Sequence, residues 1–159
     1  MPVIDPYATH LPLLVACVAH TKGPVLELGC GLYSTPLLHA LCLDRQLTSL
    51  ESNVKWYERF VRFKTANHRI EVGLDLGSLP NQQWSVVLVD QQPPNARVLS
   101  IIKLRSRVEL FVVHDSEHRR YDYEKVLKEF TYRVESRCGS PWTTVVSDKT
   151  KLDWLESVV

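Results

Sequence analysis

The fold of this chain is decided at residues 25–35, which read Val25-Leu26-Glu27-Leu28-Gly29-Cys30-Gly31-Leu32-Tyr33-Ser34-Thr35. The apolar residues at the start predict a short buried strand. The two glycines after it predict a tight turn, in which the backbone can approach a ligand without a Cβ in the way. Ser34 or Thr35 can cap a helix that begins near Pro36. Such a turn directs free N–H groups and the positive end of a helix dipole at whatever binds there.

The turn differs in two ways from the dinucleotide-binding fingerprint G-x-G-x-x-G. Ser34 stands at its sixth position, and an acid, Glu27, lies two residues before the first glycine. A carboxylate at that place repels a pyrophosphate but suits a ligand with a cationic amine. The form E-x-G-x-G resembles the first motif of class I S-adenosylmethionine-dependent methyltransferases. A third glycine often follows in that family, and Tyr33 occupies its place here. The alternative is a strand-turn-helix junction of some other α/β protein.

A second acid supports the nucleoside hypothesis. Glu51 ends a predicted strand at residues 46–51 and lies 24 residues after Glu27. An acid at this place can accept hydrogen bonds from both ribose hydroxyls of a nucleoside. The alternative is an exposed acid that caps the next helix. Residues 47–60 also resemble a subset of class I methyltransferases, in which an aromatic pair follows the acid.

The pattern of the whole chain is an alternation of strands and helices. We expect further strands at 69–74, 84–90, 109–115, 132–137 and 143–147. We expect helices at 5–20, 36–43 and 53–65, a helix that follows the loop at 91–95 and ends near residue 105, and a helix at 123–130. The last two strands predict an antiparallel hairpin, and the link at 77–83 is too short for a full helix. The resemblance implies a Rossmann-like three-layer α/β/α sandwich with a seven-stranded, mostly parallel sheet and an antiparallel last strand. We expect one domain over residues 1–159, with an N-terminal helix beside the first strand (5–20), a core (25–147) and a tail (148–159).

Composition excludes several classes of function. The 159 residues are 45% hydrophobic and 23% charged, with a formal net charge of +1, so no global field favours nucleic acid or an anionic membrane. We find no apolar run long enough to span a bilayer and no export signal at the N-terminus. The cysteines lack C-x-x-C spacing and predict buried free thiols in a reducing cytoplasm rather than a zinc site; they are Cys17, Cys30, Cys42 and Cys138.

Polar side chains follow three of the predicted strands. Asp75 comes after the third strand, where the family often contacts the adenine amino group, although a turn-forming Asp is equally compatible. Asp90 ends the fourth strand and Asp115 the fifth, so the two carboxylates should lie at neighbouring strand ends. His114, beside Asp115, and His118 are candidate proton acceptors, and a structural hydrogen bond is the alternative.

The placement of Asp90 and Asp115 is similar to that in metal-dependent catechol-type O-methyltransferases, which have an Asp-Asn pair after the fifth strand. Ser116 replaces that Asn and is a weaker ligand, so we expect no catalytic metal. Asp115 could instead cap the next helix. Arg97 could meet an anionic substrate, but as a lone surface arginine we expect it to be solvated.

The resemblance implies a methyltransferase with S-adenosylmethionine as cofactor and an oxygen or nitrogen nucleophile as acceptor. It assigns catalysis to Asp90, His114 and Asp115, and cofactor binding to Glu27, Gly29, Gly31, Tyr33, Ser34, Glu51, Asp75 and Asp90. Because no substrate domain is inserted, we expect a small acceptor rather than a macromolecule, or a site closed by a second copy of the chain. Two alternatives remain: a catalytically silent interaction module with this fold, and an NAD-type oxidoreductase, against which Glu27 argues.

Overall fold

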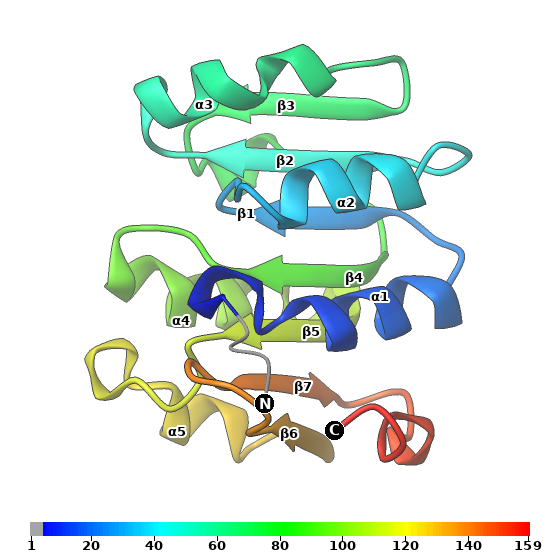
Figure 1. Cartoon of the computed structure of the whole chain (residues 1–159), viewed down its shortest axis with the longest axis vertical. Coiled ribbons are helices and arrows are strands. Elements are labelled where there is room, and N and C mark those ends of the chain that lie inside the picture. Colours follow the sequence, from blue (N-terminus) through cyan, green and yellow to red (C-terminus); the bar gives the residue numbers. More distant parts are fainter. Residues whose placement is uncertain (1–4) are drawn as a thin grey trace.

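The computed structural model describes residues 5–159 and contains one seven-stranded sheet in the order β3-β2-β1-β4-β5-β7-β6 (Figure 1). The strands are β1 (Val25–Leu28), β2 (Leu47–Glu51), β3 (His68–Val72), β4 (Trp84–Val89), β5 (Val108–His114), β6 (Tyr132–Ser136) and β7 (Thr143–Ser147). β7 is antiparallel to both of its neighbours, and the pairs among β1 to β5 are parallel. The predicted sheet, including its terminal hairpin, is confirmed.

Helices cover both faces of the sheet, which makes three layers. One face carries α1 (Leu11–His20), α2 (Ser34–Leu41) and α3 (Val54–Phe60), and the other carries α4 (Pro94–Leu104) and α5 (Tyr123–Leu127) (Figure 1). Between β3 and β4 there is only a short 3-10 turn, η3 (Leu76–Ser78), as the length of that link predicts. Other 3-10 turns are η1 (Pro6–Ala8), η2 (Val61–Phe63), η4 (Arg105–Arg107), η5 (Arg119–Tyr121) and η6 (Asp153–Leu155).

The two central strands, β4 and β5, are buried on both faces. All six residues of β4 are buried, as the unbroken apolar run predicts for a parallel strand inside a sheet. Alternate residues therefore face two separate cores: Val87 packs with Leu104 and Phe111 beneath α4, and Val86 packs with Leu14 beneath α1. These cores make the edge of the sheet a rigid support for the loops that follow β1, β4 and β5.

The first helix packs on the sheet beside the first strand, as expected. It covers β4, which pairs with β1, and the next strand, β5 (Figure 1). The physical reason for this position is that α2 already covers the β1–β2 side of this face, with Leu38 in the same core as Leu47. The segment before α1 consequently reaches the carboxyl ends of β4 and β5.

The C-terminal tail packs on the rest of the molecule. Leu152 and Leu155 are buried, and the Trp154 ring stacks on His20 at the end of α1 with 3.9 Å between ring centroids. The tail is therefore packed on the domain through these apolar side chains. Within residues 5–159, no helix has the length and apolar character needed to cross a bilayer.

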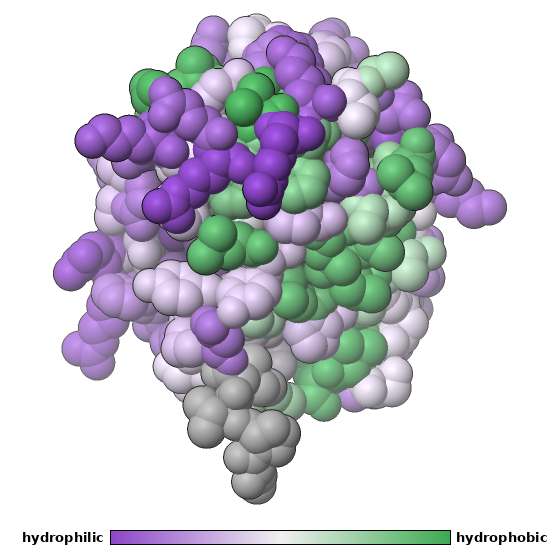
Figure 2. Space-filling model, turned by 45° about the horizontal axis from the view of Figure 1, so that its top comes forward, coloured by the Kyte–Doolittle hydropathy of each residue, from purple (hydrophilic) through white to green (hydrophobic). Residues whose placement is uncertain are grey.

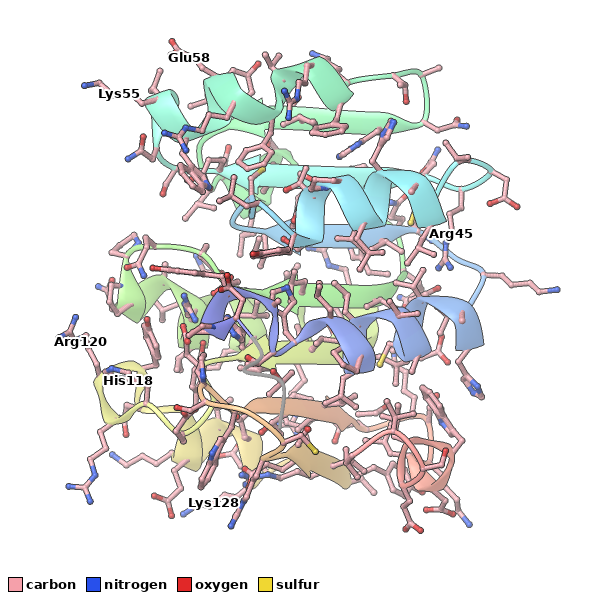
Figure 3. The ribbon with its side chains drawn as sticks, in the orientation of Figure 1. Arg45, Lys55, Glu58, His118, Arg120 and Lys128 are labelled. Atoms are coloured by element: carbon pink, nitrogen blue, oxygen red, sulfur yellow. The ribbon has the colours of Figure 1, made fainter. Side chains whose placement is uncertain are left out.

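The outer surface separates charged from apolar side chains. Figure 2 shows hydrophilic residues over α3 and a hydrophobic area over α2 and the neighbouring part of α1, where Leu41 and Leu43 are exposed. In Figure 3, Lys55 and Glu58 project from α3 away from the sheet. On the inward side of this helix Phe60 packs with Ile70 and Cys30, whereas Val54 and Val61 are exposed.

Candidate functional site

A cavity of about 620 Å³ opens at the carboxyl edge of the sheet, beside the point between β1 and β4 where the strand order reverses. Open α/β sheets bind ligands at such a point. Six segments line it: the N-terminal segment, the loop after β1, the start of α3, the segments that follow β4 and β5, and the loop between β6 and β7. The lining residues are Pro6, Tyr7, His10, Cys30, Gly31, Leu32, Trp56, Asp90, Gln92, Arg97, His114, Asp115, Tyr121 and Pro141.

The glycine turn after β1 packs tightly against the end of β4. Gly29 has φ +91°, and a Cβ built on it would lie 2.6 Å from the Asp90 carbonyl oxygen and 2.7 Å from Gln91 Cα. A side chain at this position would therefore push the two loops apart. Gly29 acts by allowing this contact between loops, whereas Gly31, two residues later, lines the cavity itself.

We expect Gly29→Ala to lower the free energy of unfolding by about 3 kcal/mol or more, because it adds a backbone clash to the cost of a positive φ. Gly73→Ala is the matched control. Gly73 also has a positive φ (+109°), but a Cβ there meets nothing within 4 Å, so we expect a loss of only about 1–2 kcal/mol. Urea unfolding measures the loss of stability in both variants. Equal losses would show that the close packing of the two loops contributes nothing to the free energy of unfolding.

Glu27 lies beneath the floor of the cavity rather than in its lining. Its carboxylate is fully buried and accepts hydrogen bonds from the hydroxyls of Ser34 (2.6 Å), Thr35 (2.9 Å) and Ser49 (2.6 Å). The Thr35 hydroxyl in turn accepts a hydrogen bond from the Gly31 N–H at 3.0 Å. Burial raises the pKa of Glu27 to about 7, although the three hydroxyl groups oppose the rise. Glu27 thus fixes the start of α2 and, through Thr35, the glycine turn.

A chain of hydrogen bonds leads from Glu27 toward the surface. Ser49 Oγ lies 2.9 Å from His68 Nε2, and His68 Nδ1 lies 3.1 Å from His39 Nδ1. Because Ser49 donates its proton to Glu27, the network assigns N–H to His68 Nε2 and leaves Nδ1 to accept from His39. Burial lowers the pKa of His68 to about 4, which agrees with a neutral ring. Sequence reasoning did not find this chain, since residues on α2, β2 and β3 meet only after folding.

Glu51 joins the ends of β1 and β2. Its carboxylate accepts the backbone N–H of Cys30 at 2.9 Å and of Asn53 at 2.8 Å. The Ser52 hydroxyl also donates to it, at 3.5 Å. A carboxylate offers about four lone-pair positions, so about one remains for a further donor. The neighbouring Trp56 donates its indole N–H to the Cys30 carbonyl at 2.5 Å, and its ring lines the cavity.

The loops after β4 and β5 bring Asp90, His114 and Asp115 together, as predicted, around Arg97. Arg97, which we expected to be a solvated surface residue, is only 2% exposed. Its guanidinium donates to Asp90 Oδ1 (2.9 Å) and to Asp115 Oδ2 (3.0 Å). It also donates to the backbone carbonyls of Gln91 and Asp90. The arginine therefore neutralises charge and fixes the shape of both loops.

His114 is held between the two carboxylates. Its Nδ1 lies 3.3 Å from Asp90 Oδ1, and its Nε2 lies 3.1 Å from the Thr9 hydroxyl. Burial alone would lower the pKa of His114, but the hydrogen bond to Asp90 and the charges of Asp90 and Asp115 raise it. Burial alone would likewise raise the pKa of Asp90, and His114 and Arg97 together lower it. The geometry favours a charged His114 bound to an ionised Asp90.

Within the described residues, Asp90, His114 and Asp115 place one donor atom each within 4.8 Å of one another, a spacing that a metal ion could use. Arg97 already bonds both carboxylates and supplies positive charge where a divalent cation would sit. We therefore assign no metal to this group. Asp115 also has φ 55°, an uncommon value for a residue with a side chain, and its bond to Arg97 helps to hold it there.

The remaining predicted site residues do not line this cavity. Tyr33 donates its hydroxyl to Asp5 at 2.8 Å, and Ser34 is occupied with Glu27. Asp75 accepts the Gly77 N–H and lines a second cavity of about 370 Å³ between η3 and α4. His118 is exposed in the loop after β5, next to Arg120 (Figure 3). The assignment of Asp75 to an adenine amino group stays a prediction.

Comparison with solved structures identifies the fold. N-methyltransferase NodS from Bradyrhizobium japonicum WM9 matches with a TM-score of 0.66 over 92% of this chain and 98% of that chain, at 15% sequence identity. The chain has the fold of class I methyltransferases.

Two further structures with the methyltransferase fold were solved with a nucleoside bound. O-methyltransferase TomG from Streptomyces achromogenes, in complex with SAM, gives a TM-score of 0.64 at 17% identity, covering 93% of this chain and 82% of that chain. The N-terminal domain of human METTL16, in complex with SAH, gives 0.63 at 10% identity, covering 94% and 73%. No protein-family model and no curated protein sequence matches the chain.

Proposed function

We propose that this protein is an S-adenosylmethionine-dependent methyltransferase that acts on an oxygen or nitrogen nucleophile of a small molecule. The observation that carries the proposal is a single cavity at the strand-order reversal, with the glycine turn at one end and the Asp90–His114–Asp115 group at the other. The likeness in fold to methyltransferases solved with SAM or SAH supports it. When bound, the cofactor supplies an activated methyl group.

The cofactor end of the proposed site is built from the loops after β1 and β2. Gly31 offers its backbone to the amino-acid part of the nucleoside. Glu51, which is buried just behind the lining at Cys30 and Trp56, offers its remaining lone-pair position to a ribose hydroxyl. Glu27 contributes indirectly, by fixing the glycine turn through the Thr35 hydroxyl, because its own carboxylate does not reach the cavity lining. Trp56 closes this end with an apolar ring.

The acceptor end needs to align a nucleophile and accept one proton. The carboxylates of Asp90 and Asp115 can accept hydrogen bonds from the hydroxyl or amino groups of an acceptor. Arg97 fixes both carboxylates in place, and Arg97 and His114 together favour the ionised form of Asp90. The N-terminal segment at Pro6 and Tyr7 covers the cavity, so a small acceptor would be shielded from water without an inserted domain.

Isothermal calorimetry with S-adenosylhomocysteine tests the proposal. We expect the parent protein to bind it and Glu51→Gln to weaken binding by about tenfold or more, because an amide accepts fewer hydrogen bonds than a carboxylate. The double variant with Glu27→Gln should bind more weakly still. Glu58→Gln, exposed on α3, is the control and should bind like the parent.

The outcome separates the alternatives. A double variant that binds as tightly as the parent would exclude the cofactor roles of both acids. Binding of S-adenosylhomocysteine without transfer from labelled S-adenosylmethionine to any acceptor would favour the catalytically silent module, to which the Tyr33 position and the absent crossover helix also point. The proposal includes a single domain in the cytoplasm, which the buried free thiols of Cys17, Cys30 and Cys42 support.

A further inference from the structure

His10 is an unpartnered imidazole inside the cavity. It is the N-cap residue of α1, is 2% exposed, and lines the cavity beside His114, with 4.6 Å between the ring centroids. Within residues 5–159, neither of its ring nitrogens has a hydrogen-bond partner. Leaving a buried polar group unpaired is costly, and such groups are uncommon in folded proteins. The position therefore calls for an explanation beyond packing.

The other candidate bases of the cavity all have partners within the protein. Asp90 Oδ1 and Asp115 Oδ2 each accept from Arg97, so the charge of both carboxylates is already paired. His114 is bonded on one side to Asp90 and on the other to the Thr9 hydroxyl. Of these imidazole and carboxylate groups, His10 is the one whose nitrogen lone pair is not used within the protein.

The charges around His10 keep its ring neutral. Burial and the neighbouring His114 together lower the pKa of His10 to about 4, and Asp90 opposes both effects. Arg97 pairs with the same Asp90 carboxylate. His10 thus stays unprotonated at neutral pH, while the adjacent His114 is the ring that favours the proton.

We propose that His10 is a catalytic residue that accepts the proton of the acceptor's hydroxyl or amino group as that group is methylated. The inference rests on the proposed function. The nucleophile oxygen or nitrogen forms its bond to the methyl carbon, and the sulfur–methyl bond breaks with its electron pair returning to sulfur. The displaced proton moves to a His10 ring nitrogen and then to water. A weak base suffices because the proton becomes strongly acidic as the new bond forms, and Asp90 stabilises the resulting imidazolium.

Two variants of His10 test the inference. His10→Leu removes the unpaired nitrogens and should raise Tm by about 2–6 °C. His10→Gln keeps a hydrogen-bonding side chain that cannot accept a proton. Both should bind S-adenosylhomocysteine within about twofold of the parent, since the residue lies at the acceptor end. Glu58→Gln, exposed on α3 and far from the cavity, is the control and should change neither quantity.

The role of the ring is measured on the S-adenosylhomocysteine complex, with catechol and ethanolamine as hydroxyl and amine probes. Long-range proton–nitrogen NMR of the imidazoles should show His10 protonating near pH 4, and at least one probe should shift its nitrogens. For any probe that the parent methylates from S-adenosylmethionine, His10→Gln should lower kcat by about 100-fold or more with an unchanged KM for the cofactor.

Three results would overturn the inference: a lower Tm in His10→Leu, His10 nitrogens that neither probe shifts, or an unchanged kcat in His10→Gln. A parent protein that does not bind S-adenosylhomocysteine would instead contradict the proposed function itself. The two failures are therefore distinguishable, because only the second is seen before any His10 variant is made.

Discussion

Arg97→Met should lower the free energy of unfolding by about 3–5 kcal/mol, because it leaves two neighbouring carboxylates without the cation that pairs them. Arg97 is almost fully buried and bonds Asp90, Asp115 and two backbone carbonyls of the β4 loop. Methionine fills a similar volume, so most of the loss comes from charge and hydrogen bonds. Urea denaturation of parent and variant at neutral pH measures it.

Arg105→Met is the matched control for Arg97→Met. Arg105 also pairs with two carboxylates, Glu129 and Asp148, but its side chain is 29% exposed, so we expect a loss of no more than about 1 kcal/mol. Equal losses would show that burial of Arg97 is not what makes its ion pairs important.

Arg97→Met also tests the conclusion that this group of side chains binds no metal ion. Without Arg97, the donor atoms of Asp90, His114 and Asp115 are free to bind a cation. We expect Mn²⁺ to raise the Tm of Arg97→Met and to leave the Tm of the parent unchanged. A parent protein that Mn²⁺ stabilises to the same extent would contradict the view that the arginine takes the place of a divalent ion.

Glu27→Gln should become more stable relative to the parent as the pH rises from about 4.5 to about 7, by about 3 kcal/mol in total. The pKa of Glu27 is about 7 in the folded protein and 4.5 in the unfolded chain. Between these values the folded state holds a proton that the unfolded state has lost, so the stability of the parent falls as the pH rises. Glutamine carries no charge and lacks this loss.

Urea unfolding of parent and variant at pH 4.5, 6 and 8 checks this expectation. Glu58→Gln, in which the replaced carboxylate lies in water, is the control, and its difference from the parent should stay constant. A constant difference for Glu27→Gln as well would mean that the three hydroxyl donors fully compensate the burial of this carboxylate. In that case the hydrogen bonds from the hydroxyl groups would outweigh the effect of burial on the pKa of Glu27.

Much of the fold could be predicted because it depends on short-range patterns. The apolar run of β4 and the alternation of strands and helices predicted the sheet. The short link after β3 predicted that no full helix lies between β3 and β4. Strand ends also predicted that Asp90 and Asp115 would meet, because the carboxyl ends of adjacent parallel strands share one edge. These features follow from periodicity and chain length alone, which the sequence contains.

The chemistry of the site was decided by tertiary structure. The sequence by itself determined the sheet, the glycine turn and the pair of aspartates. Packing of distant segments decided that Arg97 is buried between those aspartates, that Glu27 lies below the cavity, and that α1 carries His10 over β5. The physical reason is that burial and hydrogen-bond partners set the charge and direction of a side chain, and both come from residues far away along the chain.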